Sequence, residues 1–360
     1  MTKLSWLLPR STAAGRPTRQ DIDRAYRELL GRAPESEATI TFAMSYPTVA
    51  DLYLAIAKSA EYIGRAKPEP FSQFNACIDV EGIIRGHDHP GSAAVPGHVV
   101  NFLGVKMNAR FMPVPEHFAG TVMGVPIPSN FHADMSEWGA ALRAVDLARG
   151  SFTVLELGCG WGCWMINTAT AARHRGLTVH ALGVEADAAH LGFAREALAT
   201  NGFTASESTL MEGVVAARAG TALFPKPDRH GRDYGSEPLF GLEGAELERA
   251  QRSGEYDRVP VIALEDAMRG HQRIDLLHID IQGGEADLVR DTLPLLRAKV
   301  AYMVIGTHSR PIEGKLFETL GGGAFKLEVE RPAILDLRDT GPLTLVDGVQ
   351  GWRNTALTRA

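Results

Sequence analysis

Cysteine is scarce in this chain, with three residues among 360: Cys77, Cys159 and Cys163. Three cysteines, two of them only four positions apart, are too few for the disulfide framework of a small secreted domain. Their spacing also differs from the Cys-x-x-Cys pair of thiol redox proteins. The sequence therefore predicts that Cys159 and Cys163 serve packing rather than redox chemistry.

Long apolar runs are missing as well. The opening segment, residues 1–9, contains only a short apolar stretch that ends at Pro9. A secretory signal has a longer apolar centre, and a membrane helix needs about 20 apolar residues. We therefore expect no membrane span, and a cytoplasmic enzyme is the default expectation.

The chain has no block of positive charge. Its 37 Lys and Arg residues stand against 43 Asp and Glu residues, which leaves a formal net charge of -6. Non-specific binding to a phosphate backbone draws on concentrated positive charge. Nucleic acid is therefore an unexpected partner, although these numbers are compatible with a local basic groove.

Residues 18–64 have the pattern of a small helical unit. Thr18 and Thr48 are each followed three positions later by aspartate, as at a helix start, and then by apolar residues at helical spacing. His87 and His89, in the Pro/Gly-rich stretch that follows, lack further ligands at a recognisable spacing, so no metal site is predicted there. The predicted domains are a small all-α domain over 1–66, a linker with short strands over 67–129, and the main domain over 130–360.

A glycine-rich turn is the most informative motif. Val154–Leu157 reads as a buried strand, and Gly158, Gly160 and Gly162 follow in a G-x-G-x-G pattern that opens into a helix. The dinucleotide fingerprint G-x-G-x-x-G would instead need glycine at position 163. Glu156, two positions ahead of the first glycine, is placed to meet an ammonium group such as the one on S-adenosylmethionine. The motif resembles that of class I S-adenosylmethionine-dependent methyltransferases.

From residue 152 onward, strands alternate with helices, which implies a parallel sheet with right-handed crossovers. The expected strands are 153–157, 178–184, 209–216, 221–224, 274–281, 300–306 and a terminal antiparallel pair, 325–329 with 343–346. The expected helices are a leading helix over 130–149, then 161–174, one that ends at Asn201 and Gly202, and 285–298, with a loop and short helix over 225–255. The predicted fold class is α/β, a Rossmann-like seven-stranded class I methyltransferase fold with the small all-α domain ahead of it.

A second phrase, Ile274-Asp-Leu-Leu-His-Ile-Asp-Ile-Gln-Gly-Gly-Glu285, resembles the FkbM family of methyltransferases. The preceding phrase, residues 261–266, strengthens that resemblance, which extends over roughly residues 150–310. It implies methylation of hydroxyl groups on sugars, polyketides and other small molecules. The chain departs from the family at His278, where lysine is common, and at Gln282, where glutamate is frequent.

The helical unit carries a resemblance of its own. Residues 25–34, followed by 58–62, are similar to a small bacterial helical repeat related to phycobilisome linkers. That resemblance implies protein docking or assembly through residues 18–64. The alternative is a helical cap on the main domain.

Open α/β sheets bind ligands at the carboxyl ends of their strands, and acidic residues occur at those ends here. Glu185 lies 25 positions beyond Gly160, about where a carboxylate receives both hydroxyls of a ribose. Glu212 either contacts adenine or is a surface residue. The residues predicted to bind S-adenosylmethionine are Glu156, Gly158, Cys159, Gly160, Gly162, Glu185, Glu212 and Asp280.

Methylating an alcohol requires a group that takes its proton, and histidine is the usual base near neutral pH. His278 and Asp280 share one face of a strand, since side chains alternate, and His308 follows the next strand. These three residues are the predicted catalytic groups, with a structural role as the alternative for each histidine. They also suggest a divalent metal, which we do not favour because the ligand set is incomplete.

The leading helix is a further candidate for the site, because in many methyltransferases such a helix covers the cofactor. Its residues His132, Asp134 and Trp138 would then face the ligand, although a core position suits Trp138 equally well.

The predicted function is an S-adenosylmethionine-dependent O-methyltransferase that acts on a saccharide, glycan precursor or other small molecule. A nicotinamide-dependent oxidoreductase for sugar nucleotides is an alternative, opposed by the glycine spacing, by Glu156 and by the lack of a Tyr-x-x-x-Lys pair. A nucleic-acid methyltransferase would carry Asn-Pro-Pro-Tyr or Asp-Pro-Pro-Tyr where residues 280–283 stand. A non-catalytic binding module remains the third alternative.

Overall fold

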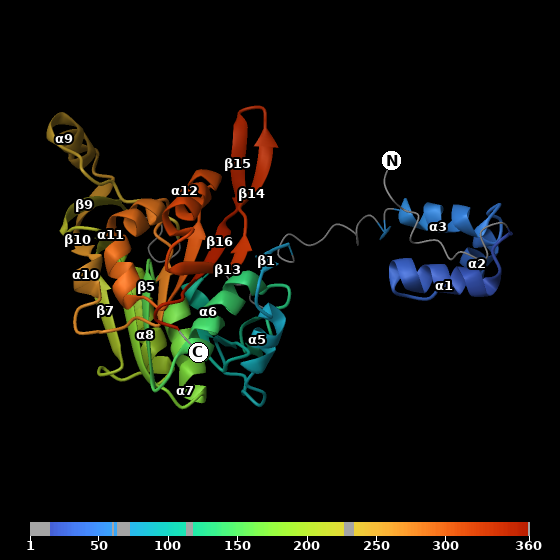
Figure 1. Cartoon of the computed structure of the whole chain (residues 1–360), viewed down its shortest axis with the longest axis horizontal. Coiled ribbons are helices and arrows are strands. Elements are labelled where there is room, and N and C mark those ends of the chain that lie inside the picture. The colour runs from blue at the N-terminus through green and yellow to red at the C-terminus, as the bar shows by residue number, and fades with distance from the viewer. Residues whose placement is uncertain (1–14, 60, 63–72, 113–117, 227–233, 359–360) are drawn as a thin grey trace. The chain divides into compact units, whose positions relative to one another are not determined.

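The computed structural model describes residues 15–59, 61–62, 73–112, 118–226 and 234–358. The chain divides into two compact units, Met1–Pro70 and Phe71–Ala360, which are described separately here (Figure 1). The apolar opening at 1–9 and the Pro-rich stretch at 67–70 lie outside the described residues. Among the helices that are described, none is long and apolar enough to cross a membrane.

Three helices lie in the described part of the first unit: α1 (Arg19–Leu30), α2 (Glu37–Ala43) and α3 (Val49–Ala57). The predicted helix starts are confirmed: the Thr18 side chain accepts from the Asp21 amide and the Asp21 side chain caps in return, while Thr48 caps α3. Apolar side chains of α1 and α3, with Ala43 of α2, form a buried core of the unit's own.

The second unit is built on an eight-stranded sheet. In spatial order its strands are β1 (Asn75–Ala76), β13 (Phe325–Arg331), β16 (Gly348–Asn354), β12 (Tyr302–Thr307), β11 (Leu276–Ile279), β5 (Ser151–Leu157), β6 (Thr178–Glu185) and β7 (Ser208–Glu212). The five strands from β12 to β7 are parallel, and β16 runs antiparallel to both of its neighbours. This is the predicted Rossmann-like α/β fold, with β1 as an added edge strand.

Helices cover both faces of this sheet. One core contains α5 (Val80–Gly86), α6 (Met135–Leu147), α7 (Cys163–His174) and α8 (Ala188–Thr200); the other contains α10 (Leu264–Ala267), α11 (Glu285–Lys299) and α12 (Arg310–Leu320). Because successive side chains of a strand point to opposite faces of the sheet, each strand contributes to both cores: Val154 of β5 belongs to the first and Leu155 to the second. Strands buried on both faces explain why β5 reads as an apolar run.

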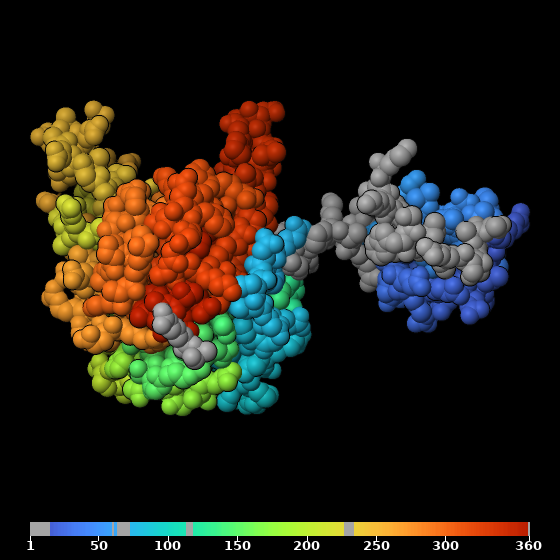
Figure 2. Space-filling view, viewed as in Figure 1, coloured from blue at the N-terminus to red at the C-terminus, as the bar shows by residue number. Residues whose placement is uncertain are grey.

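Smaller elements surround the sheet. One three-stranded sheet is formed by β8 (Val214–Ala216), β10 (Tyr256–Ala263) and β9 (Gly220–Pro225). Another is formed by β3 (Lys106–Asn108), β2 (His98–Val100) and β4 (Thr121–Val122), and the 3-10 helix η2 (Ala109–Phe111) directly follows β3. Two elements project from the body of this unit, the helix α9 (Gly244–Ser253) and the hairpin of β14 (Ile334–Arg338) and β15 (Gly341–Val346) (Figures 1 and 2).

Two strand predictions are wrong. Residues 209–216 do not form one strand, because Gly213 separates β7 of the large sheet from β8 of a smaller one. Residues 343–346 form a strand, but it belongs to the projecting hairpin, and β16 is the antiparallel partner of β13. The leading helix is confirmed over a shorter range, since α6 begins at Met135 with Asp134 as its N-cap.

Candidate active site

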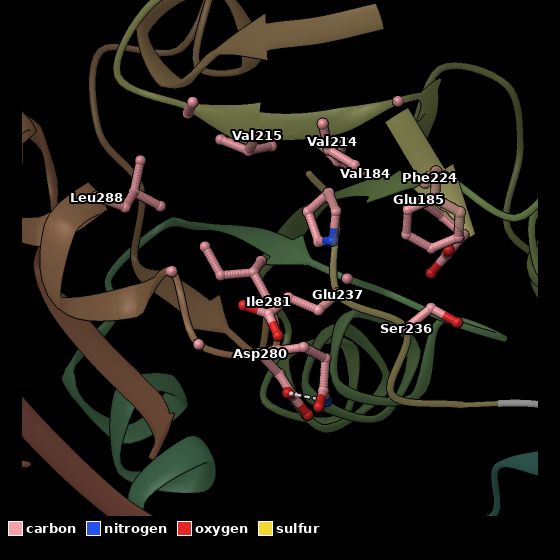
Figure 3. Close-up of a pocket in the computed structure, with 18 of the residues that line it drawn as sticks. Val184, Glu185, Val214, Val215, Phe224, Ser236, Glu237, Asp280, Ile281 and Leu288 are labelled. Atoms are coloured by element: carbon pink, nitrogen blue, oxygen red, sulfur yellow. Dashed lines mark hydrogen bonds between the residues drawn. The ribbon is translucent and has the colours of Figure 1, made fainter. Parts of the chain in front are cut away.

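A cavity of about 550 Å³ opens at the carboxyl ends of β5, β6 and β11 (Figure 3). Val214 and Val215 of β8 face Ile281 across it, with Leu288 toward one end and Glu185 toward the other. This volume suits a small molecule, since ligand pockets usually measure about 300–1,000 Å³. The predicted site residues that line the cavity are Gly158, Gly160, Glu185 and Asp280.

The glycine turn approaches the neighbouring strand very closely. A Cβ on Gly158 would lie 2.1 Å from the backbone oxygen of Asp280, and the φ of Gly158 is +74°. Gly162 serves the helix rather than the cavity, as the left-handed N-cap of α7. The turn therefore needs glycine both for its conformation and for its contact with the end of β11.

Glu156 lies beneath the turn and outside the cavity lining. Its carboxylate accepts hydrogen bonds from the amides of Trp164 (3.1 Å) and Met165 (2.8 Å). Burial raises the pKa of Glu156 to about 7. The two amide hydrogen bonds oppose this effect, because they favour the ionised form. In this conformation the side chain stabilises the first turn of α7, and its predicted contact with a ligand ammonium group stays a prediction.

Glu185, at the end of β6, is 8% exposed and lines the cavity. Its two oxygens accept from the amides of Gly160 and Asp187, both at 2.8 Å. Burial raises its pKa, while these hydrogen bonds favour the carboxylate. Because a carboxylate has about four lone-pair sites, two remain for the hydroxyls of a ligand.

Asp280 follows β11 and faces the cavity, in contact with His308. His308 Nε2 lies 3.1 Å from Asp280 Oδ1, and its Nδ1 lies 3.0 Å from Glu285 Oε1. Burial favours a neutral ring, but the two carboxylates outweigh it and raise the pKa of His308 to about 10. Although burial opposes ionisation of Asp280, the protonated ring holds the pKa of that carboxyl below its usual value.

The turn after Asp280 is organised by a buried carboxylate. Glu285 accepts from the amides of Ile281 and Gly283, each at 3.1 Å, and Gln282, with a φ of +57°, donates to Asp280 Oδ1 at 3.1 Å. Asp280, Glu285 and His308 also lie close enough together to bind a metal ion. A cation would have to displace the proton of the imidazolium, so the arrangement favours an ion-paired cluster.

His278 lies away from the cavity, on the face of β11 that is covered by α6. Its Nε2 lies 3.0 Å from Glu137 Oε1, and its ring stacks on Trp164 at 5.2 Å between centroids. Burial lowers its pKa, but the hydrogen bond and charge of Glu137 outweigh that effect and raise it. His278 is 1% exposed, so this conformation offers an acceptor no access to it.

Several other predicted residues also lie outside the lining. They are Cys159, which is buried behind the turn, Glu212, which is exposed at the end of β7, and His132, Asp134 and Trp138, which lie at or before the start of α6. Of these, Trp138 is a core residue at 1% exposure. Asp134 forms a buried ion pair with Arg331.

Much of the cavity wall is formed by residues that no sequence motif predicts. His190 of α8 and residues 234–238 line it, as do Gly213, Ala217 and the first turns of α11. A loop and a short helix were predicted for residues 225–255, but no periodicity or motif distinguishes Tyr234 among them. A contact made by one loop aromatic leaves no pattern in a single sequence.

The sequence of this chain is similar to sequences of known methyltransferases. Residues 146–330 match the family described as the methyltransferase FkbM domain. A protein of Jannaschia sp. (strain CCS1) with the name "Putative methyltransferase" is 41% identical over 275 residues, which are 76% of this chain and 98% of that protein.

Two solved structures are more distant. A Streptococcus agalactiae protein of the NADB-Rossmann superfamily is 14% identical, with 60% of this chain and 67% of that one covered and a TM-score of 0.33. A human methyltransferase 10 domain containing protein is 11% identical, with 70% and 89% covered and a TM-score of 0.36. At these scores the fold assignment rests on the strand order alone.

Proposed function

The chain belongs to the FkbM methyltransferase family, and from this we propose that it transfers a methyl group from S-adenosylmethionine to a hydroxyl group. The acceptor we propose is a saccharide, a glycan precursor or another small hydroxylated molecule, as the family resemblance implies. Membership in a methyltransferase family argues against the oxidoreductase alternative. The observation that carries the proposal is the cavity that Gly158, Gly160, Glu185 and Asp280 line together.

The residues of the cavity fit S-adenosylmethionine. Glycine at 158 and 160 keeps side chains out of the turn, and Glu185 retains acceptor sites for two ribose hydroxyls. Val214, Val215, Ile281 and Leu288 supply apolar surface for a flat base. When bound, S-adenosylmethionine supplies an electrophilic methyl group on a sulfonium.

Asp280 is the residue that we propose for the acceptor side. It is the one of the three predicted catalytic residues that lines the cavity, and His308 positions its carboxylate. The hydroxyl proton becomes strongly acidic as the oxygen gains a carbon substituent, so a carboxylate is a sufficient base. Holding the hydroxyl in line with the methyl group is the rest of the catalytic task.

The first unit has a separate proposed role. The helices described in it, α1 to α3, have their own core, and no catalytic prediction falls on them. Consistent with the resemblance of residues 18–64, we propose that the unit docks on another protein.

Calorimetric titration tests the donor assignment. We expect S-adenosylhomocysteine to bind the wild-type chain and NAD not to bind. Glu185→Gln should weaken S-adenosylhomocysteine binding by about 10–100-fold, because a buried acceptor of hydroxyl hydrogen bonds is lost. Glu212→Gln is the matched control, because Glu212 of β7 is the register partner of Glu185 but lies outside the cavity lining. The affinity of this variant for S-adenosylhomocysteine should change less than twofold.

Two further measurements complete the test. Glu185→Ala should weaken binding more than His308→Ala does, since only Glu185 lines the cavity. A methyl-transfer assay with hydroxylated glycans and small molecules tests the acceptor class and the non-catalytic alternative. If the wild-type chain does not bind S-adenosylhomocysteine at millimolar concentration, the proposed donor is wrong.

A further inference from the structure

We propose that Tyr234 is part of the donor site and that its ring packs on the nucleoside half of the donor. The inference rests on the proposed function and adds a residue that no motif of the sequence identifies. Three observations carry it: the place of Tyr234 beside Gly160 and Glu185, the contacts that hold its ring and its hydroxyl, and its partial exposure in the cavity lining.

Tyr234 lies over the glycine turn. A Cβ built on Gly160 would be 3.2 Å from Tyr234 Cε1, so the edge of the ring already touches the space above that glycine. The negative charge of Glu185 is near enough to help raise the pKa of the Tyr234 hydroxyl, second to burial. Glu185 is the residue proposed to hold the ribose, so Tyr234 lies on the nucleoside side of the cavity.

The side chain is held in this place from two directions. Its ring stacks on His190 at 4.1 Å between centroids with planes 18° apart, and its hydroxyl donates to the backbone oxygen of Phe111 at 2.5 Å. His190 is 4% exposed, and Phe111 is 1% exposed and stacks on Phe193 at 4.8 Å. A ring clamped against two buried residues is preorganised for a ligand, which reduces the entropy lost on binding.

Tyr234 is nevertheless not fully covered. The residue is 42% exposed although its ring and its hydroxyl are both held by contacts, and it lines the cavity together with residues 235–238. A fixed aromatic surface that is open to a ligand cavity gains free energy when a flat or apolar group covers it. A nucleoside supplies such a group, whereas the charged amino-acid end of the donor does not.

The test compares two ligands and three variants of the full chain by calorimetry. S-Adenosylhomocysteine carries the nucleoside and the amino-acid end, whereas 5′-methylthioadenosine carries the nucleoside alone. Tyr234→Ala should weaken the binding of both ligands by the same factor, about 10–30-fold. Tyr234→Phe keeps the ring and loses only the tether to Phe111, so we expect less than a fivefold loss.

The control is Phe317→Ala on α12, which is also 42% exposed and lies outside the cavity; its affinities should equal those of the wild type. Thermal melting checks that Tyr234→Ala still folds, and Tyr234→Leu provides an apolar variant if it does not. Unchanged affinity in Tyr234→Ala, or a loss confined to S-adenosylhomocysteine, would overturn the inference. A wild-type chain that binds neither ligand would instead contradict the proposed function.

Discussion

The glycines of the turn have different surroundings, so alanine substitutions at these positions should destabilise the protein to different degrees. Gly158→Ala places a Cβ 2.1 Å from the Asp280 backbone oxygen, whereas in Gly160→Ala the nearest atom is the edge of Tyr234 at 3.2 Å. Both positions also have positive φ. We expect Gly158→Ala to lower the free energy of unfolding by about 3–5 kcal/mol and Gly160→Ala by about 1–2 kcal/mol.

Gly192 is the control for this series. It lies inside α8, and a Cβ there would meet nothing within 4 Å. Gly192→Ala should therefore raise the free energy of unfolding by about 0.5–1 kcal/mol through helix propensity. Urea unfolding of the three variants measures the order, and equal losses at 158 and 160 would mean that the close approach to Asp280 is absent.

His308 predicts how stability depends on pH. Its pKa is raised from 6.5 to about 10 in the folded chain, so the folded state binds the proton more tightly than the unfolded state. The resulting stabilisation is fully present below about pH 6.5 and is lost as the pH rises through 10. Between pH 7 and 9.5 we expect the wild-type melting temperature to fall about 5 °C further than that of His308→Gln.

Melting curves at a series of pH values check this difference. His98→Gln serves as the control, since the His98 ring makes its hydrogen bond to a neutral group, the backbone oxygen of Pro96. Parallel pH profiles for the wild type and His308→Gln would show that the imidazolium does not depend on Asp280 and Glu285.

At the scale of elements, the start of α6 depends on a buried charge. Asp134 accepts from the amides of Ser136 (2.8 Å) and Glu137 (3.2 Å) and forms an ion pair with the buried Arg331 of β13. Asp134→Ala removes the cap and leaves the guanidinium without its partner. We expect a loss of about 3–5 kcal/mol in the free energy of unfolding.

Asp79→Ala separates the contribution of the helix cap from that of the ion pair. Asp79 caps α5 by accepting from the Gly82 amide at 2.9 Å, but it is exposed, and it forms no ion pair within the described part of the chain. Its loss should cost about 1 kcal/mol. Equal costs at positions 79 and 134, measured by urea unfolding, would show that the pair with Arg331 adds nothing.

The strands that the sequence predicted well are those buried on both faces. β5, β6 and β12 read as apolar runs because helices cover both sides of the sheet. β16 was missed because it reads Gly-Val-Gln-Gly-Trp-Arg-Asn, with polar and glycine residues at buried positions. Gly351 is required there, since a Cβ would lie 2.9 Å from the Tyr302 hydroxyl, a contact that no local pattern reveals.

The residues of the candidate site likewise differ in how far the sequence could predict them. Glu185 and Asp280 were predictable because strand ends converge at one edge of a parallel sheet. The position of Glu156 beneath α7 was not, since the motif gives the acid but not the amides that it meets. Tyr234 was missed because its place depends on stacking with His190, 44 positions earlier in the chain, and on Phe111.

At the scale of the whole molecule, each unit has its own core. Among the described residues, the core clusters of the second unit begin at Phe74. A truncated chain that begins at Phe71 should therefore fold, bind S-adenosylhomocysteine as the full chain does, and unfold in urea at the same midpoint. Tryptophan fluorescence reports this transition, because four of the five tryptophans follow position 70.

A second truncation, beginning at Asp79, should behave differently because it removes β1. Asn75 and Ala76 pair with Glu330 and Val329 at the edge of the sheet, and Phe74 and Ile78 pack against the first core. Their loss exposes β13 as an unpaired edge, which promotes association between chains. We expect a melting temperature lower by about 5 °C or more and concentration-dependent aggregation by light scattering. If the chain from Phe71 is already destabilised to the same degree, the second unit depends on the first, and the division at Pro70 does not describe how the protein folds.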